Sequence, residues 1–411
     1  MTTQPTTNCP DIFAIRSDIP ALAREVHGKP LVYLDAAATT PRPQHVIDAI
    51  NHYETHFPAN VHRGVHEFSG EATAAYEGAR RSIANFLGAD AHQLVFTRGT
   101  TESINLVANA WGSTLSPGDE ILISALEHHA NIVPWQLACE RTGAELRVVD
   151  VDGDANLHIE SVEEAFTERT RLVAMTAVSN AIGTVTPIAA ICAAARSRGI
   201  TTLVDAAQAV PHMHVDFGEL GCDFMAWSGH KMYGPTGIGG LIAQPAILEA
   251  IPPWQGGGDM IRTVSFESCT WNDIPWKFEA GTPNIGGTIG LGAAVEWLTQ
   301  IGMGAIADYE QKLLHDAVKR LRSIDRVEIV GTPASRAGAI SFVVDGMHPA
   351  DVGAMLDRHG IAVRAGHHCA QPILERFGLN STVRIAPAIY NTAGELNTFE
   401  SSLRRIIDVF G

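Results

Sequence analysis

Short apolar runs with the character of β-strands alternate with longer segments that have the apolar periodicity of helices. The expected strands are residues 93–97, 120–124, 145–149, 171–177 and 201–204. The expected helices between them are residues 101–111, 132–142 and 188–198. This alternation predicts an α/β fold in which helices cover both faces of a mainly parallel sheet. Because such sheets bind ligands just beyond the carboxyl ends of their strands, polar residues at those ends are the first candidates for a functional site.

The pattern changes after the glycine-rich residues 281–290. We expect a helix from residue 291 to residue 300, then helices alternating with strands at residues 339–344 and 361–364. The sequence therefore predicts three parts: an N-terminal segment of residues 1–30, a large domain of residues 31–294, and a smaller α+β domain of residues 295–411 that contains Cys369.

The formal net charge of −16 over 411 residues bears on possible partners. An acidic surface repels nucleic-acid phosphates and anionic lipids, so we expect neither a nucleic acid nor a membrane as partner. Residues 1–10 lack the regions of a secretory signal, and the longest apolar stretches, such as residues 188–195, are shorter than the ~20 residues of a membrane helix. We expect a cytoplasmic protein. The six cysteines are scattered without a CxxC pair, which disfavours a disulfide framework.

The sequence RGTTE at residues 98–102 follows an expected strand and opens an expected helix. A glycine turn before a helix start leaves free N–H groups that can bind an anion, and the hydroxyls of Thr100 and Thr101 add donors. An ordinary capped helix, with one of these threonines as N-cap, explains the motif equally well.

Asp205 ends an apolar strand in the sequence DAAQA. An acid in this position often caps a helix or forms a turn. It can also pair with a buried cation, and a protonated pyridine nitrogen is one such cation.

Lys231 lies in the sequence SGHKMYGP, directly after the apolar run of residues 224–227. Its neighbours are small or turn-forming, so the backbone can approach a ligand closely. A lysine whose pKa is lowered by its site forms imines with carbonyl compounds, and Ser228 and His230 beside it are candidate phosphate donors. The following GIGG at residues 237–240 lacks the GxGxxG spacing of dinucleotide sites, and we interpret it as a turn.

Cys369 lies in the sequence RAGHHCAQP, beside two imidazoles and near Arg364. This setting favours the thiolate, although this motif alone is also compatible with a free cysteine in a loop. Adjacent His-His-Cys residues rarely converge on one metal ion, and the CxxC and HExxH motifs are missing, so we expect no metal site. His62 and His66 have the spacing of a helical metal pair, but the Arg63-Gly64 between them makes a regular helix doubtful.

Taken together, the motifs resemble a known family. The order RGTTE, EHHANIVPW, DAAQA, SGHKMYGPTGIG, FEAGTPN and RAGHHCAQP, between about residue 33 and residue 392, resembles the cysteine desulfurases of the class V aminotransferase family, of the SufS/CsdA type. The resemblance implies fold type I of the pyridoxal 5′-phosphate (PLP) enzymes, with a sheet of seven strands in the large domain. It also implies a homodimer with active sites at the subunit interface.

The resemblance also implies roles for individual residues. Lys231 is expected to hold PLP as a Schiff base, Cys369 to accept sulfur, and His128 to stack on the cofactor ring. The other expected cofactor contacts are Asp205 at the pyridine nitrogen, Asn180 and Gln208 near the ring hydroxyl, Thr100, Thr101, Ser228 and His230 at the phosphate, and Thr282 from the other subunit. The expected substrate contacts are Arg384, Arg364, Arg63 and Asn180.

The implied activity is a PLP-dependent sulfurtransferase reaction that converts L-cysteine to L-alanine and leaves a persulfide on Cys369. An acceptor protein of the SufE, SufU or CsdE kind would take the sulfur for iron–sulfur cluster assembly. L-Selenocysteine is an alternative substrate. The rival hypotheses are a selenocysteine lyase, a cysteine sulfinate desulfinase or an aminotransferase of the same fold, and a non-catalytic scaffold in an iron–sulfur assembly complex.

Overall fold

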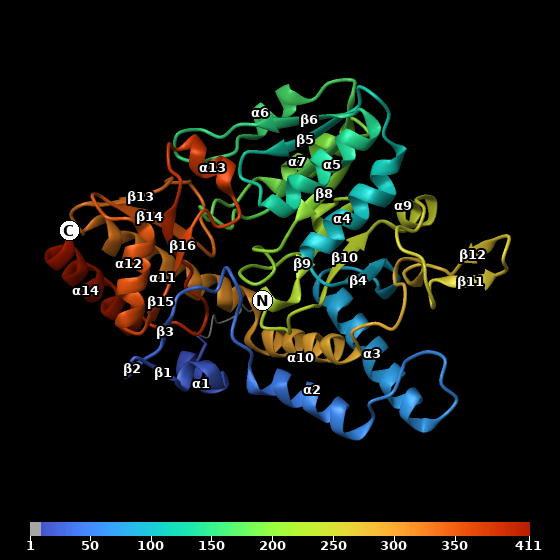
Figure 1. Ribbon diagram of the computed structural model, residues 1–411, viewed down its shortest axis with the longest axis horizontal. Coiled ribbons are helices and arrows are strands. Elements are labelled where there is room, and N and C mark those ends of the chain that lie inside the picture. The colour runs from blue at the N-terminus through green and yellow to red at the C-terminus, as the bar shows by residue number, and fades with distance from the viewer. Residues whose placement is uncertain (1–9) are drawn as a thin grey trace, which may run out of the picture.

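The computed structural model describes residues 10–411, in which a central sheet of seven strands has the order β4-β10-β9-β8-β7-β5-β6 (Figure 1). These strands are β4 (Leu94–Thr97), β5 (Glu120–Ser124), β6 (Glu145–Val149), β7 (Thr170–Thr176), β8 (Thr201–Asp205), β9 (Phe224–Ser228) and β10 (Gly239–Ala243). All neighbours pair in parallel except β10, which is antiparallel to both β4 and β9. The predicted α/β fold with a mainly parallel sheet is confirmed, and the five expected strands agree with the structure to within a residue at each end. The first nine residues of the predicted N-terminal segment, including Cys9, lie outside the described part of the chain.

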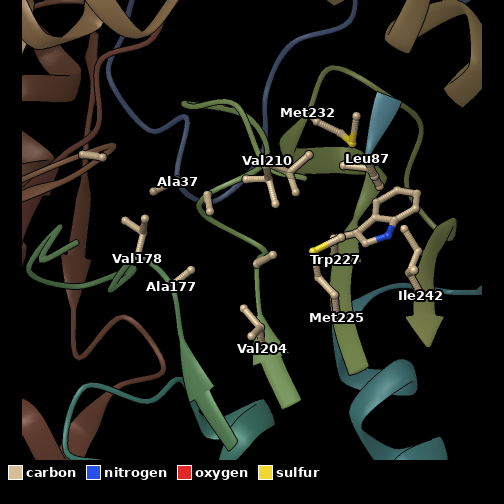
Figure 2. Packing of buried hydrophobic residues seen from close by; sticks show 14 of the residues in the cluster. Ala37, Leu87, Ala177, Val178, Val204, Val210, Met225, Trp227, Met232 and Ile242 are labelled. Carbon is tan, nitrogen blue, oxygen red and sulfur yellow. The ribbon is translucent and has the colours of Figure 1, made fainter. Parts of the chain in front are cut away.

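Helices cover both faces of this sheet, which explains why its strands are apolar almost throughout. Neighbouring strand residues belong to separate buried clusters: Val204 and Met225 to one, Leu203 and Phe224 to the other. Figure 2 shows Val204, Met225 and Trp227 in the first cluster. The helices that contribute to it are α3 (Glu67–Phe86), α7 (Ile188–Ser197) and α10 (Ile285–Ile301), whereas α4 (Thr100–Ala110) and α5 (Val133–Thr142) contribute to the second.

The interpretation of residues 237–240 as a turn is wrong in part. Gly237 has a φ of 74° and does turn, but Gly239 and Gly240 begin strand β10. A Cβ atom on Gly239 would lie 2.7 Å from the Cα atom of Gly99, and one on Gly240 would lie 2.8 Å from the ring of Trp227. The glycines therefore serve close packing inside a strand.

The expected start of a helix at residue 291 is also wrong, because α10 begins at Ile285. Glycines of its first turns face neighbouring helices. A Cβ atom on Gly290 would lie 2.7 Å from Ile50 on α2 (Gln44–His56), and one on Gly292 would lie 2.8 Å from Ala79 on α3. Figure 1 shows α10 lying along α2 and α3. Tertiary packing outweighs the low helix propensity of glycine here.

A second sheet, of order β13-β14-β17-β16, lies at the other end of the molecule, and all of its pairs are antiparallel (Figure 1). Its strands are β13 (Val327–Ile329), β14 (Ile340–Val344), β16 (Arg364–Gly366) and β17 (Thr382–Ile385). The helices of this region are α11 (Met303–Arg322), α12 (Pro349–Arg358), α13 (Gln371–Arg376) and α14 (Ala393–Phe410). The single strand expected at residues 361–364 is two strands, because β15 (Ile361–Ala362) leaves this sheet and pairs with β3 (Val32–Tyr33).

The domain boundary near residue 295 stays a prediction. Helix α10 runs across it, and the pairing of β3 with β15 joins the start of the predicted large domain to the C-terminal region. In residues 10–411 no single helix is both long and apolar enough to cross a membrane; α10 and α11 meet that test only together, across a bend of 76°. The remaining elements are α1 (Ile12–Ser17), β1 (Glu25–Val26), β2 (Lys29–Pro30), α6 (Ile159–Ala165), α8 (Phe217–Leu220), α9 (Pro245–Ala250), β11 (Ile261–Val264) and β12 (Cys269–Trp271).

Candidate active site

A cavity of about 220 Å³ lies beyond the carboxyl ends of β7, β8 and β9, where the strand alternation places ligands in folds of this kind. Its wall is completed by residues from the region of the second sheet. The predicted site residues that line it are Thr100, Thr101, His128, Asn180, Asp205, Gln208, Ser228, His230, Lys231, Arg364, Cys369 and Arg384. Twelve positions spread over nearly three hundred residues thus meet in one cavity.

Lys231 ends the short 3₁₀ turn Gly229–Lys231, directly after β9. The turn is held in place because the backbone oxygen of His230 accepts hydrogen bonds from the N–H of Thr40 and the hydroxyl of Thr39. Burial lowers the pKa of Lys231 to about 8, although the charge of Asp205 opposes this shift. Its amine is therefore far more available as a nucleophile and base near neutral pH than that of a surface lysine.

Asp205 is the last residue of β8 and is 4% exposed. Burial raises its pKa, while the Ala207 N–H that it accepts at 2.9 Å and the charge of Lys231 act in the opposite direction. A buried carboxyl group that is incompletely compensated gains most from a cationic partner. Beside it, the Gln208 side chain donates to the backbone oxygen of Ala37 at 2.8 Å, which fixes its orientation.

The N-terminus of α4 forms a further part of the cavity wall. Gly99, with a φ of 146°, is the N-cap residue, so neither threonine caps the helix. The Thr100 N–H donates to Ser228 Oγ at 2.9 Å, and a Cβ atom on Gly99 would lie 3.0 Å from that oxygen. With Thr101 and His230 in the same wall, hydroxyls and a helix N-terminus provide donors suited to a phosphate.

His128 lies in the loop after β5. Its Nδ1 accepts the Ala130 N–H at 3.0 Å, and burial, reinforced by the charge of Lys231, lowers its pKa to about 3. The ring is therefore neutral. Glu127, which the sequence did not reveal, anchors this loop: it accepts from the Asn131 side chain at 2.7 Å and the Thr176 N–H at 3.0 Å. Burial raises the pKa of Glu127 to about 8.

Arg384, on β17, is 2% exposed and makes two hydrogen bonds. It donates to the backbone oxygen of Asn180 at 2.9 Å and to Asp35 Oδ1 at 3.0 Å. Its Nε is buried and has no partner among residues 10–411. Arg364 also contacts Asp35, at 3.4 Å. Sequence reasoning missed Asp35, although an acid directly after an apolar strand is the same signal that singled out Asp205.

Cys369 lies on the exposed loop between β16 and α13 and borders the cavity. The neighbouring His368, which sequence reasoning left without a role, is buried and forms a hydrogen bond with Thr382 Oγ1 at 2.8 Å. The Asn180 side chain donates to the backbone oxygen of His368 at 2.6 Å. A loop of the C-terminal region is thus tied to the central sheet at the cavity.

Two predicted site residues lie outside this cavity. Arg63 is exposed and forms an ion pair with Asp259 at 2.8 Å. Thr282 is exposed in the loop before α10 and lines a different pocket, together with Arg98 and Glu102. No group of three or more His, Cys, Asp or Glu side chains in the described range is arranged to hold a metal ion, and residues 62–66 are not helical.

Comparison with known proteins identifies the class. Residues 32–399 match the family described as Aminotransferase class-V, and the chain belongs to this family, whose architecture here is fold type I of the PLP enzymes. The chain is 51% identical over 400 residues to a cysteine desulfurase of Klebsiella pneumoniae (strain 342). The matched residues cover 97% of this chain and 98% of that relative. The chain is 50% identical, with the same coverage, to the cysteine desulfurase of Escherichia coli (strain SE11).

Solved structures agree with this relationship. The cysteine desulfurase CsdA from Escherichia coli superposes with a TM-score of 0.91 at 37% identity, covering 98% of this chain and 100% of that chain. The apo cysteine desulfurase from Thermococcus onnurineus NA1 superposes with a TM-score of 0.90 at 38% identity, covering 95% and 98%. The resemblance to cysteine desulfurases that the motifs predicted is therefore confirmed.

Proposed function

We propose that this protein is a PLP-dependent cysteine desulfurase, which converts L-cysteine to L-alanine and takes the sulfur onto Cys369 as a persulfide. The observation that carries this proposal is the pairing of two nucleophiles at one cavity: a buried lysine of lowered pKa and a thiol on an exposed loop. An aminotransferase of the same fold needs the lysine but has no use for the thiol.

The cavity fits PLP. Asp205 suits a protonated pyridine nitrogen, the flat neutral ring of His128 suits a stacking contact, and the polar groups of Thr100, Thr101, Ser228 and His230 suit a phosphate. Lys231 is the residue that would hold the aldehyde. When bound, PLP supplies a carbonyl group for the substrate amine and withdraws electrons from the substrate carbon atoms.

The residues of the chain supply the rest of the chemistry. Arg384 lines the cavity, its hydrogen-bonding capacity is not fully used within residues 10–411, and its guanidinium group would bind the substrate carboxylate, which orients the substrate. With a pKa of about 8, the Lys231 amine is suited to take the proton from Cα as a general base. The Cys369 thiolate would attack the substrate sulfur: the S–S bond forms, the Cβ–S bond breaks, and its electron pair leaves with carbon, which is then protonated to the methyl group of alanine.

We further propose a homodimer, a cytoplasmic location and an acceptor protein of the SufE, SufU or CsdE kind that carries the sulfur toward iron–sulfur cluster assembly. The exposed positions of Thr282 and Arg63 support the dimer, since both would reach an active site only from the surface of a second subunit. The exposure of Cys369 supports hand-over to a protein, because a persulfide on a buried thiol could not be reached.

The test measures alanine and sulfide released from L-cysteine, with and without candidate acceptors. We expect Lys231→Ala to lose the visible absorbance of the bound cofactor, and Cys369→Ala to keep that absorbance but release no sulfur. Cys269→Ala is the control, because Cys269 is an exposed thiol on β12, away from the cavity.

A yellow and fully active Lys231→Ala variant would refute the role of Lys231, and a colourless, inactive wild-type protein would favour the scaffold hypothesis. Parallel assays with selenocysteine and cysteine sulfinate rank the alternative substrates. Selenium leaves carbon more readily than sulfur, so selenocysteine turnover that survives in Cys369→Ala is compatible with the proposal.

A further inference from the structure

The loop that carries Cys369 has an unusual backbone. His368 and Cys369 both have positive φ angles, 55° and 54°, and neither is glycine. Two successive side-chain-bearing residues in the left-handed region are strained, and such strain persists only where surrounding contacts enforce it. The contacts that hold this loop therefore determine where the thiol lies.

His129 supplies two of those contacts, both on the C-terminal side of Cys369. Its backbone N–H donates to the Cys369 carbonyl oxygen at 2.7 Å. Its ring Nε2 accepts the N–H of Gln371, the first residue of α13, at 3.2 Å. His367 adds a contact from within the loop, because its Nδ1 accepts the Cys369 N–H at 3.2 Å.

His129 is itself firmly placed. It follows β5 in the short turn His129–Asn131, and the Asn131 side chain donates to the buried carboxyl group of Glu127 at 2.7 Å. The loop of the C-terminal region is thus held by a residue anchored to the central sheet, the same sheet that carries Lys231. Lys231 and Cys369 are therefore both held in place relative to the central sheet.

The ring contact requires a neutral imidazole, because a protonated ring has no acceptor nitrogen. Burial and the nearby His367, whose ring centroid lies 5.5 Å away, lower the pKa of His129. The ring therefore stays neutral, with Nε2 free to accept, under ordinary conditions.

We infer that His129 is a positioning residue for the thiol: its backbone N–H and its ring Nε2 clamp the loop at two points directly after the Cys369 side chain and hold the sulfur at the mouth of the cavity that contains Lys231. This inference rests on the proposed function for its catalytic meaning. The clamp itself is a property of the folded chain that can be measured without turnover.

The experiment compares two variants of the holoenzyme. His129→Phe keeps a planar ring but removes the acceptor, whereas the amide oxygen of His129→Gln restores one. In His129→Phe we expect amide hydrogen exchange at Gln371 and iodoacetamide alkylation of Cys369 to become about fivefold faster, the factor given by one lost hydrogen bond of ordinary strength. His129→Gln should behave as the wild type. Alkylation of Cys269, read from the same digests, is the internal control and should not change.

Turnover adds a second readout. Since the thiol acts after the substrate is bound, kcat for L-cysteine should fall in His129→Phe while KM stays unchanged, and His129→Gln should recover kcat. A role in general stability would instead change Cys269 as much as Cys369, or affect both variants equally, and either result overturns the inference.

Two outcomes separate the clamp from the proposed function. If the protein has no desulfurase activity but the contrast between the variants holds, the clamp stands and the function fails. If the protein is active but the two variants do not differ, the proposed function stands and the clamp is refuted. If His129→Phe does not fold, amide hydrogen exchange at Gln371 in the wild-type protein still tests the clamp. Rapid exchange there would show that the Gln371 N–H is not held and that no clamp exists.

Discussion

Two buried arginines, Arg80 and Arg384, each pair with a carboxylate but differ in how completely they are satisfied. Arg80, on α3, is 1% exposed and donates to both oxygens of Glu279 at 2.8 Å, to Glu77 at 3.0 Å and to the Leu94 carbonyl oxygen at 2.8 Å. Arg384 is 2% exposed, makes two hydrogen bonds and keeps an Nε that, in the structurally described chain, has no partner.

The pKa shifts of the two arginines have opposite directions. Burial opposes the charge of both. For Arg80, the charge and hydrogen bonds of Glu279 outweigh burial, and the pKa is raised. For Arg384, burial outweighs the contribution of Asp35, and the pKa is lowered. Burial and an ion pair alone therefore do not identify a functional arginine; a position in the wall of a cavity together with incomplete hydrogen bonding does, because the guanidinium group can then bind an incoming carboxylate.

The largest effect we expect is on stability. Arg80→Met leaves Glu279 buried without its counter-charge and should lower the free energy of unfolding by about 3–5 kcal/mol, the usual effect of removing one partner of a buried ion pair. Denaturant unfolding of the variant and the wild type measures this difference.

The double variant Arg80→Met with Glu279→Gln is the control, and it should recover part of the lost stability because the uncompensated charge is gone. The folded Arg80→Met protein should keep the wild-type KM for L-cysteine. If Arg80→Met raised the KM for L-cysteine strongly as well as lowering the free energy of unfolding, Arg80 and Arg384 could not be assigned different roles.

The same substitution at the other arginine should act on catalysis. Arg384→Met removes the proposed carboxylate contact and should lower kcat/KM for L-cysteine about 100-fold, which corresponds to about 3 kcal/mol, as for a lost charged hydrogen bond in a buried site. Stability should change much less than in Arg80→Met, because fewer bonds are lost. Steady-state kinetics and denaturant unfolding, done on one preparation, give both values; an active but unstable Arg384→Met variant would contradict the assignment.

The third effect concerns Asp35, which forms ion pairs with both arginines of the cavity, Arg364 and Arg384. Its carboxylate lies 3.0 Å from Arg384 and 3.4 Å from Arg364, so it competes with a substrate carboxylate for the same guanidinium groups. We expect Asp35→Asn to lower KM for L-cysteine about threefold, within the range of a partly exposed ion pair. L-Cysteine methyl ester, which lacks the carboxylate, is the matched control and should show no change. An increase in KM would mean that Asp35 mainly orients Arg384.

Much of the fold was predictable because buried parallel strands are apolar runs bounded by turn residues. Strands β5 and β6 have the predicted bounds. The errors occur where tertiary contacts determine the secondary structure. Gly290 and Gly292 belong to a helix because α2 and α3 pack too closely for a side chain, and Gly240 belongs to a strand that packs closely against the Trp227 ring. Neither neighbour can be identified from local sequence.

The candidate site was predictable as a set of residue types but not as a network. Lys231, Asp205 and Cys369 stand out because charged or reactive groups follow apolar runs or cluster together. Asp35 carries the same local signal as Asp205, but its importance lies in a contact with Arg384, far along the chain. Glu127 does not stand out, since its importance lies in complete burial. The two exposed residues, Arg63 and Thr282, remain tied to a proposed second subunit.

The smallest effect concerns Glu77, the outer partner of Arg80. Burial raises its pKa, but hydrogen bonds and charges from His62 and Arg80 outweigh burial, and the net shift is downward from 4.5. Because the folded-state pKa is the lower one, its contribution to stability is complete above the ordinary pKa and is lost as the pH falls through the folded-state value.

Glu77→Gln should therefore be less stable than the wild type at neutral pH, by no more than about 1 kcal/mol for a partly exposed pair. The difference should shrink as the pH falls below the ordinary carboxyl pKa of 4.5. Denaturant unfolding at neutral and acidic pH measures both values. The expected loss is small because Glu279 already meets most of the needs of Arg80 through two hydrogen bonds. If Glu77→Gln instead destabilised the protein as much as Arg80→Met, Arg80 could not be regarded as saturated by Glu279, and its contrast with Arg384 would rest on the cavity alone.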